Sequence, residues 1–135
     1  MDAAQALADL TEISTQIEAA LIADEKGAVL ASTFAGEESA REAARSAVDL
    51  LVAAEDAGQN GAVSLTQVLA ATREGSVFVV RGDDRVAVAV TGPEPTVGLV
   101  FYDLKTCLRL SASEPEKPKR TGRRKKKDEE QNVDA

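Results

Sequence analysis

The stretch "SVFVVRGDDRVAVAVTGPEPTVGLVFYDLKTCLR", residues 76–109, decides the fold. Two β-branched, apolar segments, Ser76–Arg81 and Arg85–Thr91, are separated by a Gly-Asp-Asp turn, which is the pattern of a β-hairpin. The segment "TGPEP" then breaks the sheet, and Thr96 fits a helix N-cap. The apolar residues that follow recur at helical spacing, at Val97, Val100, Phe101, Leu104 and Leu108. The stretch therefore predicts two antiparallel strands followed by a helix.

The residues before this stretch add further strands. Residues 62–72 form another apolar run, so residues 62–91 predict a three-stranded meander. Upstream, "ALIADEKGAVLAST", residues 20–33, places apolar runs on both sides of Asp-Glu-Lys-Gly. Asp24 and Gly27 suit a type I turn, because the carboxylate can accept backbone N–H bonds and Gly tolerates positive φ. The alternative, an acid–base site at Asp24 and Glu25, is disfavoured because nothing nearby is expected to shift the pKa of either carboxylate.

Two more segments have helical periodicity. In residues 3–20 the spacing of three and four runs through Leu7, Leu10, Ser14, Ile17 and Leu21, with Ile13 beside it. Residues 37–57 form the second, which Gly58 ends as a C-cap. Its apolar stripe is made mainly of small side chains, at Ala40, Ala43, Ala44, Ala47, Val48, Leu51 and Ala54. Such a stripe suits close packing against a sheet or against the same helix of a second copy.

The order of elements is therefore α-β-β-α-β-β-β-α. All strand connections except the helical crossover are short, which favours a five-stranded antiparallel sheet with helices on its faces, an α/β (α+β) fold. We expect one domain over residues 1–113. Residues 114–135 are charged, contain Pro and lack apolar periodicity, so they predict a disordered tail.

Composition and charge describe an acidic domain with a basic arm. The chain has 135 residues, 44% of them apolar, and a net charge of −7. Residues 1–113 contain 8 Lys/Arg and 17 Asp/Glu, whereas residues 114–135 contain 8 Lys/Arg and 6 Asp/Glu. One cysteine, Cys107, excludes an internal disulfide. The absence of a basic, apolar leader or a membrane-length apolar run leads us to expect a cytoplasmic protein.

The sequence offers little for catalysis. With no His, Ser–His and Cys–His pairs are impossible and the commonest transition-metal ligand is missing. Cys107 lies in the predicted last helix and is expected to be a buried structural thiol. Asp83 and Asp84 are better explained as a solvated turn than as a cation site. Because no phosphate-binding loop is present either, we predict a protein that is not an enzyme, with no metal, cofactor or small-molecule substrate.

The basic arm permits two interpretations. Its cations are Lys117, Lys119, Arg120, Arg123, Arg124, Lys125, Lys126 and Lys127, with no acid among them. Such a run can bind the phosphates of nucleic acid or of an anionic membrane by releasing counterions. No aromatic residue is interleaved to stack on bases. The other interpretation, a solubilising tail that folds back on the acidic domain, is equally compatible with the sequence.

The element order, the hairpin over residues 20–33 and above all residues 76–109 resemble the roadblock family, over about Asp2 to Ser111. This family includes the dynein light chains of that name and bacterial proteins that act on Ras-like GTPases. The resemblance implies a homodimer in which the helix over residues 37–57 packs against its partner's copy. It also implies that the strand from Leu65 to Thr72 pairs across the two-fold axis, which continues one sheet through both subunits. The implied contacts are Ala40, Ala44, Ala47, Val48, Leu51, Leu65, Gln67 and Leu69.

The resemblance further implies a partner. Roadblock proteins are scaffolds and regulators that often present the paired helices to a small GTPase, and the outward residues here are Arg41, Arg45, Asp49 and Val52. Either arginine could contribute to GTP hydrolysis, although solvated surface charge is the simpler interpretation of each alone. Two alternatives remain. One is an adaptor tethered to nucleic acid or anionic membrane through the basic arm, and the other is a structural subunit of a larger complex.

Overall fold

A computed structural model describes residues 2–58 and 66–112. Its elements are α1 (Ala3–Ile13), β1 (Ile17–Asp24), β2 (Val29–Ser32), α2 (Glu37–Ala57), β3 (Gln67–Ala71), β4 (Ser76–Arg81), β5 (Arg85–Thr91) and α3 (Val97–Ala112). The predicted order and the bounds of α2, β4 and β5 are confirmed. The predicted third strand began at residue 62, but residues 59–65, including Leu65, lie outside the described residues.

The first helix is shorter than predicted. It ends at Ile13, where the Ser14 N–H donates to Leu10 O at 2.8 Å, and Ile17 already begins strand β1. The prediction of a helix up to residue 20 was therefore wrong. Ile17 is buried in the same core as Leu7 and Leu10. The spacing of apolar residues by three and four positions thus continues from the helix into the strand, although the backbone changes between them.

The five strands form one antiparallel sheet in the order β2-β1-β5-β4-β3. The central strands β1 and β5 are nearly continuous apolar runs because both of their faces are covered. The sheet has two edges, β2 and β3. Each edge strand exposes unpaired backbone N–H and C=O groups, to which another strand can pair.

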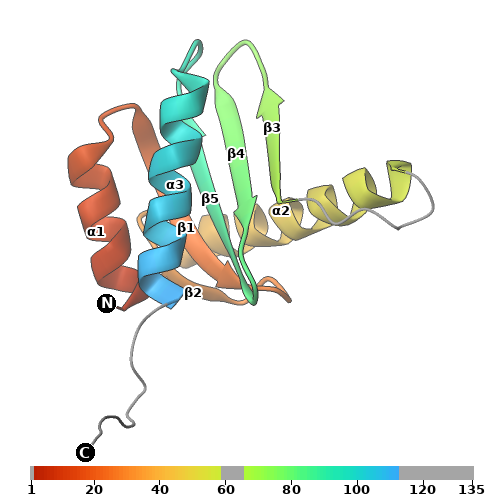
Figure 1. Ribbon diagram of the computed structural model, residues 1–135, viewed down its shortest axis with the longest axis horizontal. Coiled ribbons are helices and arrows are strands. Elements are labelled where there is room, and N and C mark those ends of the chain that lie inside the picture. The colour runs from red at the N-terminus through yellow and green to blue at the C-terminus, as the bar shows by residue number, and fades with distance from the viewer. Residues whose placement is uncertain (1, 59–65, 113–135) are drawn as a thin grey trace, which may run out of the picture.

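Helices cover the sheet from both sides (Figure 1). Helices α1 and α3 lie side by side on one face, where their apolar stripes pack on Phe78 and Ile22. The rings of Phe78 and Phe101 meet edge to face, with centroids 4.9 Å apart. Helix α2 covers the other face and packs on Leu21 and Val88. In the view of Figure 1 the C-terminal end of α2 runs out past β3.

The turn between β1 and β2 confirms the interpretation of the acidic stretch. The Asp24 carboxylate accepts the backbone N–H groups of Lys26 and Ala28, each at 2.9 Å, and Gly27 has φ +95°. The expectation that nothing shifts its pKa was wrong, since the N–H of Ala28 and then that of Lys26 lower the pKa of Asp24. The main groups that the expectation missed are these backbone N–H groups, and the Lys26 charge adds a smaller effect in the same direction. Because the charged form is favoured, this carboxylate serves the turn and is a poor proton donor.

Candidate partner-binding faces of helix α2

Helix α2 presents three stripes, and the stripe of small residues is buried within the chain. Ala40, Ala44, Ala47 and Leu51 are at most 4% exposed and pack on the sheet. These four residues, which were predicted as dimer contacts, are therefore covered by the chain's own sheet. Val48 lies next to this stripe and is half-buried.

A charged flank lies on one side of the buried stripe. It consists of Arg41, Arg45, Asp49 and Val52, which are all exposed and recur at steps of three and four residues along one face. The structure therefore brings the predicted partner-binding residues together. We call these four residues the charged flank.

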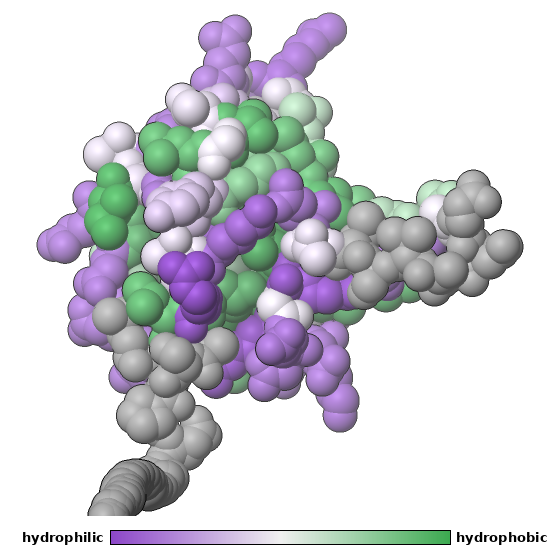
Figure 2. Space-filling model, in the orientation of Figure 1, coloured by the Kyte–Doolittle hydropathy of each residue, from purple (hydrophilic) through white to green (hydrophobic). Residues whose placement is uncertain are grey.

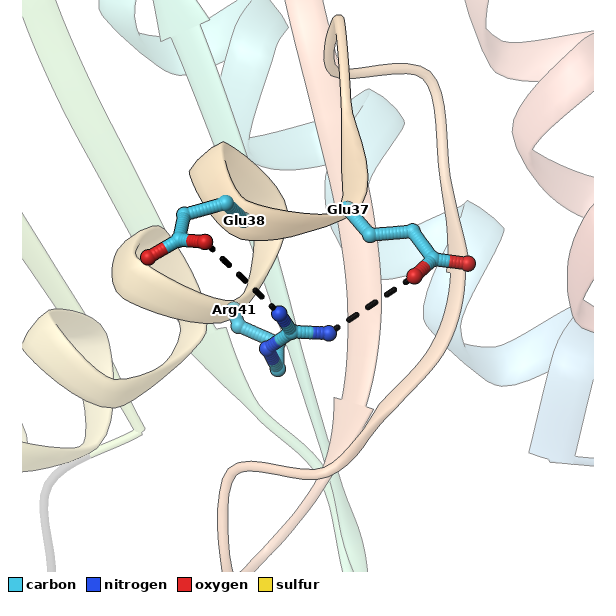
Figure 3. Close-up of polar contacts among 3 residues, drawn as sticks. All are labelled: Glu37, Glu38 and Arg41. Carbon is cyan, nitrogen blue, oxygen red and sulfur yellow. Dashed lines mark ion pairs between the residues drawn. The ribbon is translucent and has the colours of Figure 1, made fainter.

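Figure 3 shows that Arg41 is shared between two carboxylates of the first helical turn. Its guanidinium lies 3.7 Å from Glu37 and 3.9 Å from Glu38. The Arg41 side chain is 58% exposed, and ion pairs between exposed groups contribute little to stability. A partner can therefore take over this guanidinium at small cost.

Two grooves run beside the charged flank. One, of about 560 Å³, is lined by β2, Phe34 and the first turns of α2, including Arg41. The other, of about 460 Å³, is lined by Val52 together with Glu25 and Asp83 from the hairpin turns and Arg85 from the start of β5. The turn at Gly27 lies against α2 near Arg45 and Val48, between the residues of the two grooves. The flank therefore forms a ridge with a mainly apolar groove at one end and a polar groove at the other.

The C-terminal half of α2 is held in place by an ion pair. The Glu55 carboxylate binds the Arg81 guanidinium of β4, and both side chains are largely buried. At the helix end the Gly58 N–H donates to Ala54 O and Glu55 O, each at 3.2 Å. Sequence analysis missed this pair because its members lie 26 residues apart, and no local pattern connects them.

On the other side of the buried stripe lies an apolar flank. Ala43, Ser46 and Leu50 line a groove of about 230 Å³ whose opposite wall is formed by Val77 and Val90 of the sheet. Ala43 and Leu50 are half-buried and Ser46 is exposed. We call these three residues the apolar flank. Part of this flank was visible in the sequence, because Ala43 belonged to the predicted stripe.

The groove beside the apolar flank reaches β3, which is an open edge of the sheet. The Arg81 N–H donates to Thr66 O at 2.8 Å. Because antiparallel strands alternate between groups that face the neighbour and groups that face away, Gln67, Leu69 and Ala71 direct their backbone N–H and C=O to the open side. The register with β4 is regular along the whole strand.

The opposite edge, β2, is unsuited to further pairing. It has only four residues, and its register with β1 shifts so that Leu30 has no partner. Short edges and bulges are the features by which proteins block strand addition. Of the two edges, β3 alone offers a regular ladder.

The remaining predicted sites are the basic arm, the turn with Asp83 and Asp84, and the Cys107 thiol. The arm residues 117–127 lie outside the described residues. Asp83 and Asp84 are exposed at a turn, and within residues 2–58 and 66–112 no three His, Cys, Asp or Glu side chains gather as a metal site would require. Burial, and secondarily Asp9, raises the pKa of Cys107 to about 11, so this thiol is a weak nucleophile.

The backbone closely matches solved structures. A Roadblock/LC7 domain from Streptomyces avermitilis superposes with a TM-score of 0.75 at 18% identity, over 83% of this chain and 96% of that one. The chain has the roadblock fold. The gliding protein MglB from Thermus thermophilus matches with a TM-score of 0.65 at 19% identity, over 80% and 86% of the two chains. Profilin IA from Acanthamoeba castellanii matches more weakly, with a TM-score of 0.52 at 15% identity, over 73% of this chain and 87% of that one.

Sequence comparison alone does not find these similarities. No model of a known protein family matches the roadblock-fold chain, and no curated protein matches it. Within the described residues, no helix has the length and apolar content that a membrane span requires.

Proposed function

We propose that this chain is a non-catalytic, homodimeric roadblock module that binds and regulates a small Ras-like GTPase. The observation that carries the proposal is the division of α2 into two accessible flanks on either side of its buried stripe. One flank is apolar and its groove reaches an open strand edge. The other is charged and bordered by two grooves. A helix with two unlike accessible flanks suits two different partners, one of which is a second copy.

The apolar flank and the β3 edge support the dimer. Pairing of β3 with its two-fold mate would satisfy the outward backbone groups of Gln67 and Leu69, and it would bring the apolar flanks of the two α2 helices together. An isologous contact of this kind buries the same surface on both copies. The proposed contacts are therefore Ala43, Ser46 and Leu50 with β3, in place of the residues that the sheet already covers.

The charged flank supports the GTPase partner. Arg41 and Arg45 carry exposed guanidinium groups, Asp49 adds the opposite charge, and Val52 supplies an apolar contact. Roadblock neighbours that include MglB from two organisms place this chain among proteins of the same fold. A dimer would present two charged flanks. In this role the module acts by contact, either by positioning the GTPase's own groups or by supplying an arginine to the transferred phosphate.

Calorimetric titration tests the GTPase partner. The probe is a small Ras-like GTPase of the same organism, loaded with a non-hydrolysable GTP analogue. Arg45→Glu and Val52→Asp are expected to weaken binding about tenfold or more, as loss of a charged or apolar contact does. Arg73→Glu, in the exposed turn between β3 and β4, is the control that changes the same charge away from α2.

The outcome separates the parts of the proposal. Unchanged affinity in both flank variants would refute the charged flank as the binding site. If the wild-type chain does not bind this GTPase, the partner assignment is refuted, while sedimentation still reports on the dimer. GTP hydrolysis measured with the same variants distinguishes regulation from simple binding.

A further inference from the structure

An apolar groove also runs along the seam between α1 and α3, on the face of the sheet opposite α2. It measures about 200 Å³, and its apolar lining includes Leu10, Ile13, Tyr102 and Leu110. Ile13 is 72% exposed and Tyr102 68%. Figure 2, which views this side, shows apolar and charged surface interleaved over the two helices. Exposed apolar side chains that line one groove together form the kind of contiguous patch that often marks an interaction surface.

The charged side chains that line this groove are acidic, whereas the α3 cations Lys105 and Arg109 line a separate groove. Asp9 and Asp103 line the groove. The N-terminal segment that supplies α1 and β1 carries acids at Asp2, Asp9, Glu12, Glu18, Asp24 and Glu25, and residues 2–25 contain no Lys or Arg. An occupant of this groove must therefore bring positive charge together with enough hydrocarbon to cover the apolar lining.

The chain carries such a segment immediately downstream. The arm, Lys117 to Lys127, has eight cations and no acid, and it starts five residues after Ala112, where α3 ends. Leu110, two residues before that end, already lines the groove. Five residues span up to about 17 Å, and α1 is about 16 Å long. The arm can thus reach every position along the seam.

We propose that the arm docks on the α1–α3 groove of its own chain. Lys and Arg ammonium and guanidinium groups pair with Asp9 and Asp103, while their aliphatic stems cover Ile13 and Leu110. Tyr102 offers an exposed ring face on which a guanidinium stacks. Docking holds the arm's cations away from other polyanions, so nucleic acid or an anionic membrane must compete with the groove. The inference is independent of the dimer and GTPase proposals, which use α2 and β3.

Paramagnetic relaxation in the full-length chain tests the docking. Thr121→Cys places a nitroxide in the middle of the arm, and Cys107 stays unlabelled because it is buried and its pKa is raised to about 11. At low salt the amides of Asp9, Ile13 and Tyr102 should lose at least half of their intensity, while α2 amides keep theirs. In about 1 M salt, where the Debye length is roughly 3 Å, the intensities should recover.

Matched variants identify the groove. Asp9→Asn with Asp103→Asn should abolish the broadening, whereas Glu42→Gln with Asp56→Asn, which removes the same charge from exposed sites on α2, should not. Broadening confined to α2, absent broadening, or broadening equal in both double variants would each overturn the proposal. A mixture of isotope-labelled chain without nitroxide and unlabelled chain with it should show no broadening. Broadening there would mean that the arm docks on another copy.

Discussion

Replacing Leu69 by proline isolates the proposed strand pairing across the two-fold axis. The Leu69 N–H points to the open side of β3, so proline at this position removes a donor that the protomer itself does not use. Proline is tolerated on edge strands for this reason. The fold of the protomer should therefore survive. In the dimer, each copy would lose one intermolecular hydrogen bond and would introduce a ring at the interface.

The expected loss of dimer stability follows from the two-fold symmetry of the proposed pairing. Two hydrogen bonds are lost per dimer, and each contributes about 1 kcal/mol net, so the loss is about 2 kcal/mol before any steric clash. Because 1.4 kcal/mol corresponds to about a factor of ten, the dimer dissociation constant should rise at least about 30-fold. Analytical ultracentrifugation over a concentration series measures this constant, and circular dichroism verifies that the protomer remains folded.

Two controls make the result decisive. Leu69→Ala removes the side chain but keeps the N–H, so it should weaken the dimer less than Leu69→Pro does. Ala70→Pro removes an N–H that faces β4, so it should destabilise the protomer itself. Equal dimer constants for Leu69→Pro and the unmodified chain, with the fold intact, would refute β3 as the pairing edge.

Further expected outcomes follow from the same geometry. Ser46→Glu should yield a folded monomer in sedimentation, because the residue is exposed on the apolar flank. Ala47→Glu should instead lower the free energy of unfolding of the protomer by at least about 3 kcal/mol in denaturant titrations, because it buries a charge under the sheet. The reverse pattern would contradict the assignment of the stripes. Asp24→Ala should destabilise the chain at neutral pH. Because the folded-state pKa lies below its usual value of 3.8, this difference should persist above that value and vanish as the pH falls through the folded-state pKa; a pH-independent difference in thermal denaturation would argue against the turn carboxylate. The Cys107 thiol should react with a disulfide reagent at neutral pH only at the rate of unfolding, and fast reaction in native buffer would show that the α1–α3 seam opens.

The sequence predicted elements well where local chemistry marks their ends. Gly58 and the Gly-Asp-Asp turn delimit α2 and the β4–β5 hairpin, and both lie where expected. The end of α1 was missed because Ser14 continues the helical spacing and Ile17 enters the same core as the helix. A periodic pattern reports which side chains are buried together, not whether the backbone between them changes from helix to strand.

The candidate site was predicted in part for the same reason. The shared, exposed face of the charged flank was predicted correctly, since residues one helical turn apart lie on the same face of a straight helix. The stripe predicted as the dimer contact is covered by the chain's own sheet, because periodicity identifies an apolar face but not the surface that covers it. Ala44 and Leu51 face the sheet, whereas Ser46 and Leu50 border the open groove. That distinction depends on how the sheet lies under the helix, which is set by contacts distant in sequence.

The length of α2 leaves part of the helix without sheet beside it. Its 21 residues extend about 32 Å, whereas five strands at 4.8 Å spacing span only about 19 Å from first to last. The helix crosses the sheet and must project beyond it, as Figure 1 shows at the β3 edge. Ala53 and Ala57 in its last turns are exposed, so small apolar residues continue where the sheet has ended. A second copy paired along β3 would place its own sheet and helix beside this projecting end, and the excess helix length would then become contact surface.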